Sequence, residues 1–165
     1  MKIKYELRHT DSKAPVRATE GSLGLDLYAA TLAVTDGYIE YDTGVAFEFE
    51  PGWGAEVFAR SSVSKTDLIL CNGTALIDQD FSGTVKLRFR DISKNPTQKA
   101  DAYKVGDRIG QIVFRKYEKV TLEQTSRIEE SESRGSQGFG STGVKDLHGE
   151  QKQVKPKNTK VRKGK

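Results

Sequence analysis

The densest group of residues that could carry out chemistry is the stretch NGTALIDQDFSG, residues 72–83. Asp78 follows directly after the apolar Ala-Leu-Ile, and we expect its carboxylate to be partly desolvated. Desolvation favours a raised pKa, and a carboxylate with a raised pKa can act as a general base. The alternative is a structural hairpin in which Asp80 and Gly83 form the turn. The hairpin accounts for Gly83, but it gives no reason for an acidic residue at position 78.

A second candidate site is an anion-binding corner at ARSSVSK, residues 59–65. Arg60 would supply a positive charge, Ser61 a hydroxyl group, and the start of a helix its free N–H groups. We expect a helical turn or two within residues 61–68, with a serine as the helix N-cap. The structural alternative, which the residues favour equally, is an N-cap next to a surface arginine.

Two polar residues stand inside stretches with strand-like patterns. In GSLGLDLYAA, residues 21–30, the two leucines beside Asp26 point to one side of the predicted strand and Asp26 to the other. On its own, this pattern is more typical of an exposed strand aspartate than of a functional one. In VGDRIGQIVF, residues 105–114, a turn leads into a strand that carries Gln111. The alternative for this stretch is a hairpin followed by a buried strand.

The stretch RGSQGFGSTG, residues 134–143, is rich in glycine and contains one arginine and one aromatic residue. Glycine amides can approach phosphate oxygens closely because no Cβ atom intervenes. Arg134 would pair with a phosphate group. Ser141 and Thr142 would add hydroxyl groups, and Phe139 would stack on a base. Such a strip could fold over a bound nucleotide and exclude water.

Alternating apolar and polar residues predict that most of residues 1–143 is β structure. Residues 84–90, TVKLRFR, alternate strictly, so the apolar Val85, Leu87 and Phe89 share one face. Residues 44–50 and 108–114 are further strand candidates. Turn-forming Gly, Pro and Asp residues recur at short intervals along the chain. This organisation favours an antiparallel all-β sandwich or barrel, with the short helix as its one helical element.

The basic charge of the 165-residue chain is concentrated in residues 144–165. This segment contains eight Lys or Arg and two Asp or Glu, whereas residues 1–143 contain 19 basic and 21 acidic residues. The segment has few apolar residues and no aromatic ones, which predicts a disordered tail. A solubilising role for the tail is favoured over contact with nucleic acid.

Cysteine content and hydropathy indicate the compartment. The single cysteine, Cys71, excludes an internal disulfide framework. No apolar run approaches the roughly 18 residues needed to cross a bilayer. The N-terminal residues MKIKYELRHT lack the apolar block of a secretory signal. We therefore expect a cytoplasmic protein that has no membrane partner.

Read in order, five stretches resemble the five motifs of the trimeric deoxyuridine triphosphatases (dUTPases). They are GLDL, ARSS, GTALIDQDFSG, GDRIGQ and RGSQGFGSTG, and the match covers most of residues 21–143. The resemblance implies a distorted, jelly-roll-like all-β barrel with one short helix. It also implies a dUTPase domain over residues 1–143, with a flexible closing arm at about 134–143, followed by the tail at 144–165.

The resemblance implies an activity and an assembly as well. Members of the family hydrolyse dUTP to dUMP and pyrophosphate with Mg²⁺, which limits uracil incorporation into DNA and supplies dUMP. They are homotrimers in which each active site draws on more than one subunit. For this chain, the resemblance therefore implies dUTP as the substrate, Mg²⁺ as the cofactor and two further copies of the chain as partners.

The matching motifs imply a role for each site residue. Asp78 matches the aspartate that activates water for in-line attack on the α-phosphorus, and Asp26 matches the aspartate that holds waters of the metal. The remaining matches are Arg60, Ser61, Ser62 and Gln111 for the phosphates, Asn72, Gly73, Leu76 and Ile77 for uracil, Phe81 beneath the deoxyribose, and Arg134, Phe139, Gly140, Ser141 and Thr142 for the closing arm.

Four features depart from the family pattern. Phe81 stands where tyrosine is usual, so the ring is kept but a hydroxyl contact is lost. Gln137 and Ser62 each stand where glycine is common. The segment at 90–105 is a few residues longer than in a minimal member. None of these changes removes a reactive group.

Two other functions stay open. A dCTP deaminase of the same fold, alone or bifunctional, also carries an RSS stretch. Such an enzyme needs a glutamate in the strand after the hairpin, and that strand reads TVKLRF here. A protein that binds a regulatory partner when dUTP is bound is the second alternative, for which the basic tail and the longer segment at 90–105 are the hints.

Overall fold

The computed structural model describes residues 2–93 and 103–129 of the chain. The described residues up to Thr121 belong to one compact unit, and those from Leu122 onward do not belong to it. The predicted domain boundary near residue 143, the tail and much of the segment at 90–105 lie outside the described residues. The same holds for the residues predicted for the closing arm, which are Arg134, Gln137, Phe139, Gly140, Ser141 and Thr142.

The described residues contain ten strands and one short helix, so the all-β prediction is confirmed. The helix, η1, is a 3₁₀ helix over Ser61–Lys65. The strands are β1 (Lys4–Leu7), β2 (Leu25–Tyr28), β3 (Thr31–Val34), β4 (Ile39–Asp42), β5 (Val45–Glu48), β6 (Trp53–Ala59), β7 (Leu68–Leu70), β8 (Thr74–Ile77), β9 (Lys86–Asp91) and β10 (Arg108–Lys116).

The strands form one two-stranded sheet and two four-stranded sheets, and every strand pairing is antiparallel. Their strand orders are β1-β5, β2-β10-β6-β8 and β3-β4-β9-β7. In the described part of the chain the sheets stay open, so the barrel-like fold is not closed by hydrogen bonds. Both four-stranded sheets contribute to one buried cluster, whose members include Leu27, Tyr41, Val57, Phe89 and Ile109.

The alternation in β9 confirms the pattern read from residues 84–90. Val85, Leu87 and Phe89 are at most 1% exposed, whereas the Lys and Arg residues between them face outward. Burial of three apolar side chains on one face contributes about 1.5–3 kcal/mol for each of them. The register of β9 is therefore fixed, since a shift by one residue would place its cations in the core.

The helix η1 begins differently from the sequence prediction. Arg60, not a serine, is the N-cap residue, and it makes no side-chain capping hydrogen bond. The predicted serine cap is therefore wrong. The first turn is instead closed by the backbone, because the N–H of Val63 donates to the carbonyl oxygen of Arg60 at 2.9 Å. The hydroxyl groups of Ser61 and Ser62 are not used for capping, which leaves them available to other partners.

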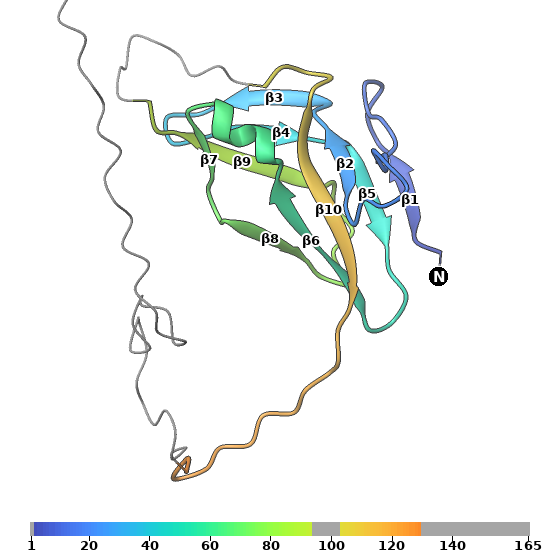
Figure 1. The fold of residues 1–165 in the computed structure, drawn as a ribbon. Coiled ribbons are helices and arrows are strands. Elements are labelled where there is room, and N and C mark those ends of the chain that lie inside the picture. The colour runs from blue at the N-terminus through green and yellow to red at the C-terminus, as the bar shows by residue number, and fades with distance from the viewer. Residues whose placement is uncertain (1, 94–102, 130–165) are drawn as a thin grey trace, which may run out of the picture. The chain divides into compact units, whose positions relative to one another are not determined.

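Strand β6 connects the two regions that carry the candidate site residues (Figure 1). At its start, Ala55 pairs with Ile77 of β8, directly before Asp78. At its end, Phe58 pairs with Gln111 of β10, and β6 leads into η1. The two regions therefore lie at opposite ends of the same strand.

Candidate active site

Two arginines and a glutamine surround the buried carboxylate of Asp26. The Asp26 residue is 1% exposed. Its Oδ1 accepts hydrogen bonds from Arg60 Nε at 3.2 Å and from Gln111 Nε2 at 3.0 Å. Its Oδ2 accepts one from Arg108 Nη1 at 2.9 Å. Asp26 is thus not the exposed strand aspartate that its pattern favours, because β10 and Arg60 cover the outer face of β2 at this point.

The cluster has the charge and the donors to bind an anion. A buried carboxylate is costly unless it is paired, and two guanidinium groups more than balance this one. Each guanidinium has five N–H donors in a planar fork, and Asp26 accepts from one nitrogen of each. The side chains of Arg60 and Arg108 are 23% and 45% exposed, so their other donors can reach a ligand at the surface. Asp26 orients both arginines by accepting a hydrogen bond from each.

Arg108 is a member of the cluster that the sequence reading missed. It stands three residues before Gln111, and strand alternation would place the two side chains on opposite faces. A β-bulge between Arg108 and Gly110 shifts the pairing of β10 with β2. The bulge adds one residue to β10, which brings both side chains to Asp26. The glycine that follows Arg108 by two residues hinted at an irregular strand, but the alternation gave no sign of the shift.

A cleft of about 460 Å³ lies along β8 and the turns on either side of it, and residues of β9 also line it. It brings together most of the predicted hairpin residues. Its lining consists of Cys71, Asn72, Ala75, Leu76, Ile77, Asp78, Phe81, Thr84, Lys86 and Arg88. Gly73 lies in the turn before β8 with a φ of 65°, a conformation that favours glycine. The cleft therefore joins an apolar wall, one carboxylate and one aromatic ring.

The Phe81 ring is folded back onto Gly83. A Cβ atom at position 83 would stand 2.7 Å from Cζ of the ring, so any other residue here would force the ring to move. The turn here spans residues 78–81 and is closed by the N–H of Phe81, which donates to the carbonyl oxygen of Asp78 at 3.1 Å, so Gly83 lies after it. The structure therefore gives Gly83 a packing role in place of the turn role that the hairpin alternative predicts. Gly83 provides the space in which the ring rests.

Asp78 is exposed in the single chain, so the expected desolvation of its carboxylate is wrong for one copy of the protein. The residue stands just past the end of β8, which is an edge strand of its sheet. No strand within residues 2–93 or 103–129 covers it on the outer side. The apolar residues before it are also partly open to solvent, as shown by the 66% exposure of Leu76.

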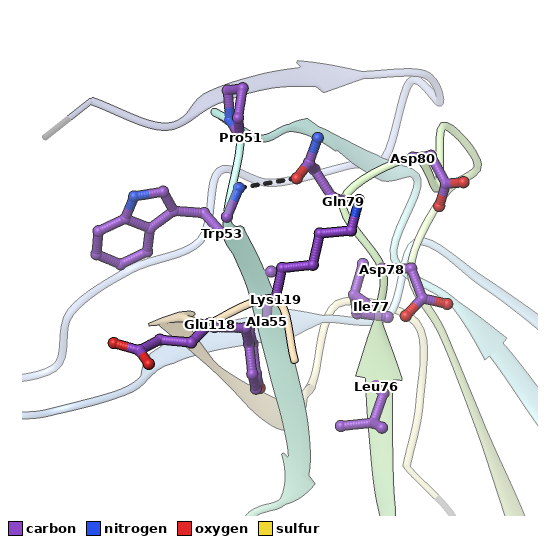
Figure 2. Close-up of a pocket in the computed structure, with 13 residues that line it drawn as sticks. Pro51, Trp53, Ala55, Leu76, Ile77, Asp78, Gln79, Asp80, Glu118 and Lys119 are labelled. Carbon is purple, nitrogen blue, oxygen red and sulfur yellow. Dashed lines mark hydrogen bonds between the residues drawn. The ribbon is translucent and has the colours of Figure 1, made fainter. Parts of the chain in front are cut away.

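A second cavity, of about 660 Å³, lies on the other side of the turn that follows β8. Figure 2 shows that the carboxylates of Asp78 and Asp80 point away from Trp53 in this view. The turn is fastened to the β5–β6 loop on this side. The N–H of Gly52 donates to Gln79 Oε1 at 2.8 Å, the bond drawn as a dashed line. This contact fixes the backbone next to Asp78.

Asp78 and the arginine cluster are far apart within one copy of the chain. The register places Asp78 beside Gly54, and Arg60 follows Gly54 by six residues along β6. At a rise of about 3.3 Å per residue, the separation along the strand is about 20 Å. A nucleoside triphosphate cannot place one phosphorus atom beside both groups at this distance. The structure therefore places these two groups of candidate residues at opposite ends of β6.

Comparison with known proteins identifies the family. The model of the dUTPase family matches residues 10–143. The chain belongs to the dUTPase family. The deoxyuridine 5′-triphosphate nucleotidohydrolase of Helicobacter pylori strain J99 is 34% identical over 149 residues, which cover 87% of this chain and 98% of that protein. The enzyme of the same name from Desulfitobacterium hafniense is 37% identical over 150 residues, covering 87% and 96%.

Solved structures agree with the dUTPase fold. The dUTPase of Staphylococcus bacteriophage 80alpha with dUpNHpp has a TM-score of 0.74 and 22% sequence identity, covering 87% of this chain and 99% of that one. The dUTPase of phage phi11 of S. aureus has a TM-score of 0.65 and 19% identity, covering 78% and 99%. At these identities the likeness shows the fold. No helix in the described part of this dUTPase-family chain is long and apolar enough to cross a membrane.

The described residues of this dUTPase-family chain are compatible with one mode of magnesium binding, in which the substrate provides the direct ligands. They contain no group of three His, Cys, Asp or Glu side chains that could hold a metal. Asp26 does not suit direct coordination, because three protein donors, two of them cationic, already occupy its oxygens. Mg²⁺ keeps several waters and is often bound through substrate phosphates. The described residues therefore fit an ion that would be bound mainly through substrate phosphates, and Asp26 would hold it only through a water molecule.

Proposed function

We propose that this protein hydrolyses dUTP to dUMP and pyrophosphate by in-line attack of water on the α-phosphorus. The observation that carries this proposal is the cleft beside β8, where an edge strand, an aromatic ring and Asp78 face one space. The names of the relatives and the matching family model support dUTP as the substrate. The reaction would limit uracil incorporation into DNA and supply dUMP, in a cytoplasmic protein.

The cleft suits uracil and deoxyribose. Because β8 is at the edge of its sheet, one side of its backbone has N–H and C=O groups without partners among the described strands. In the proposed complex, the backbone of Leu76 and Ile77 reads the uracil edge together with Asn72 and the turn at Gly73. The Phe81 ring packs beneath the sugar. A slot of this kind rejects cytosine because its buried polar groups would go unpaired.

The arginine cluster suits the phosphates. In the proposed complex Arg60, Gln111 and Ser61 bind phosphate oxygens, and Arg108 adds charge to the same surface. The hydroxyl oxygen of Ser62 is buried and has no hydrogen-bond partner among the described residues, so it can also serve a ligand. The proposed closing arm at 134–143 would complete the enclosure with Arg134, Phe139, Gly140, Ser141 and Thr142.

Asp78 is the proposed general base. Its carboxylate would accept a proton from the attacking water, a contribution of typically 10²–10⁴-fold in rate. When bound, Mg²⁺ supplies charge that offsets the negative charge developing on the phosphate oxygens. The arginines hold the leaving pyrophosphate by paired hydrogen bonds. Binding of a nucleotide and of a second subunit would exclude water from a carboxylate that is exposed in the single chain.

The proposed assembly is a homotrimer with shared active sites. The separation of about 20 Å between Asp78 and Arg60 along β6 supports it, because one copy cannot bring both groups to one phosphate. In a closed ring, Asp78 of one copy can face the arginine cluster of the next. The matched family region, residues 10–143, supports a dUTPase domain that ends near residue 143, with a separate basic tail at 144–165.

A substrate panel tests the proposed function. Pyrophosphate release should be fastest from dUTP, and kcat/KM for dCTP should be lower by about 10⁴–10⁵. For UTP it should be lower by roughly 5- to 150-fold, because the ribose 2′-hydroxyl would lose its hydrogen bonds next to the ring. Similar rates with all four of dUTP, dCTP, dTTP and UTP would contradict the proposal. Ammonia release from dCTP would instead support a deaminase.

A further inference from the structure

The N-terminal strand contacts the turn that carries Phe81. Arg8, which directly follows β1, donates from Nη1 to the carbonyl oxygen of Ser82 at 2.6 Å. Its Nε donates to Glu6 Oε2 at 2.8 Å, which orients the guanidinium. The two ends of the Arg8–Ser82 contact are 74 residues apart in the chain. None of the five motifs contains Arg8.

Arg8 is itself held on a rigid part of the fold. Its N–H donates to the carbonyl oxygen of Gly44 at 2.7 Å, directly after the pairing of Leu7 with Val45. Val45 is completely buried, and its carbonyl oxygen accepts a hydrogen bond from the N–H of Val85 at 2.8 Å. Strand β5 therefore anchors both Arg8 and the chain that follows the turn. The hydrogen bond from Arg8 to Ser82 therefore links the exposed turn before Val85 to this anchored part of the fold.

The Phe81 ring depends on this turn for its position. The ring is 42% exposed and lines two grooves, the cleft with Asp78 and a second space of about 460 Å³ that Arg8 and Phe47 also line. The ring lies against Gly83, and both grooves border it. The backbone at residues 81–83 sets the position of the ring relative to the cleft. Within the described residues, Arg8 is the one side chain that donates a hydrogen bond to the backbone of this segment.

We propose that Arg8 is a positioning residue for sugar selection. By holding the Ser82 carbonyl group, it keeps the Phe81 ring close enough to the sugar to leave a ribose 2′-hydroxyl without a hydrogen-bond partner. The inference rests on the proposed function, since it assigns a cause to the preference for dUTP over UTP. It concerns a residue that does not touch the nucleotide and acts through Phe81.

Three single substitutions test this role. Arg8→Met keeps the aliphatic stem and removes the donor, and it should lower the ratio of kcat/KM for dUTP over UTP by about three- to tenfold. Faster turnover of UTP should account for most of the change. Arg8→Lys, which keeps one donor, should retain part of the preference. The control Lys4→Met breaks an ion pair of the same strand, with Glu48 at 2.8 Å, and should leave the ratio unchanged.

Amide hydrogen exchange over residues 79–84 provides a readout that does not need turnover. Arg8→Met should increase exchange in this segment, and Lys4→Met should not. If the wild type prefers dUTP and Arg8→Met keeps both the full preference and slow exchange, the role of Arg8 is contradicted and the proposed function stands. If the wild type has no preference for dUTP, the proposed function fails first. If Arg8→Met does not fold, Arg8→Lys and Arg8→Ala take its place. The inference is overturned if both of these variants keep the full wild-type ratio of kcat/KM for dUTP over UTP and unchanged amide exchange.

Discussion

Asp78→Asn should lower kcat for dUTP by about a thousandfold, within the range typical of a lost general base. The substitution keeps the size and the hydrogen-bonding shape of the side chain but removes the basic carboxylate. The binding of dUTP should change by no more than about threefold, because the proposed contacts to uracil and phosphate come from other residues. Single-turnover kinetics and calorimetric titration with a non-hydrolysable dUTP analogue measure the two effects separately.

Asp80→Asn is the matched control for this experiment. Asp80 stands in the same turn, is exposed like Asp78 and has the same charge. Its removal changes the electrostatic potential of the turn by the same amount, and it should reduce kcat by far less than a factor of ten. If Asp78→Asn retains the wild-type kcat, or if both variants lose activity equally, Asp78 is not the base.

Asp26→Asn should lower the unfolding midpoint by about 10 °C, even in the presence of EDTA. The substitution leaves Arg60 and Arg108 close together without the carboxylate that pairs them. Removing one partner of a fully buried ion pair costs about 3–5 kcal/mol. We expect a loss of about 2–3 kcal/mol in the free energy of unfolding here, because both arginines are partly exposed. In a unit of this size, each kcal/mol lowers the unfolding midpoint by about 3–5 °C. Differential scanning fluorimetry without metal measures this effect.

Glu56→Gln provides the comparison for Asp26. Glu56 accepts a hydrogen bond from Arg115 Nε at 2.6 Å on the same sheet, but more than half of the Arg115 side chain is exposed. Exposed ion pairs contribute little to stability, so the midpoint of this variant should stay close to that of the wild type. If Asp26→Asn is as stable as Glu56→Gln without metal and loses only its response to Mg²⁺, Asp26 acts through the ion and not through the arginines.

Local sequence patterns predicted the strands well. In β9, strict alternation fixed which residues are buried, because a half-exposed strand has a period of two. The short helix was predicted within residues 61–68, but its cap was not, because the backbone alone closes its first turn. The motifs also predicted that Asn72 and Asp78 share a cleft. These two residues flank the short strand β8, so their relative position is set by residues that are close in the sequence.

Long-range packing explains what the sequence did not reveal. The local pattern at Asp26 favours an exposed aspartate, because nothing near it in the sequence shows that Arg60 and β10 cover it. Arg108 was missed because a bulge breaks the alternation of β10. The exposure of Asp78 follows from the place of β8 at a sheet edge. Each of these features depends on pairing between distant strands, which a pattern within one strand does not encode. The Arg8–Ser82 contact belongs to the same class.

The assembly of one active site from two copies is the central claim, and mixing two inactive variants tests it most directly. Asp78→Asn lacks the base, and Arg60→Met lacks part of the phosphate-binding cluster at the other end of β6. After subunit exchange at a ratio of 1:1, about a quarter of the sites in randomly assorted closed rings would combine an intact base with an intact cluster. We expect about a quarter of the wild-type dUTPase activity. Activity that does not exceed the sum of the two separate variants would show that each copy supplies its own complete site and would contradict the account.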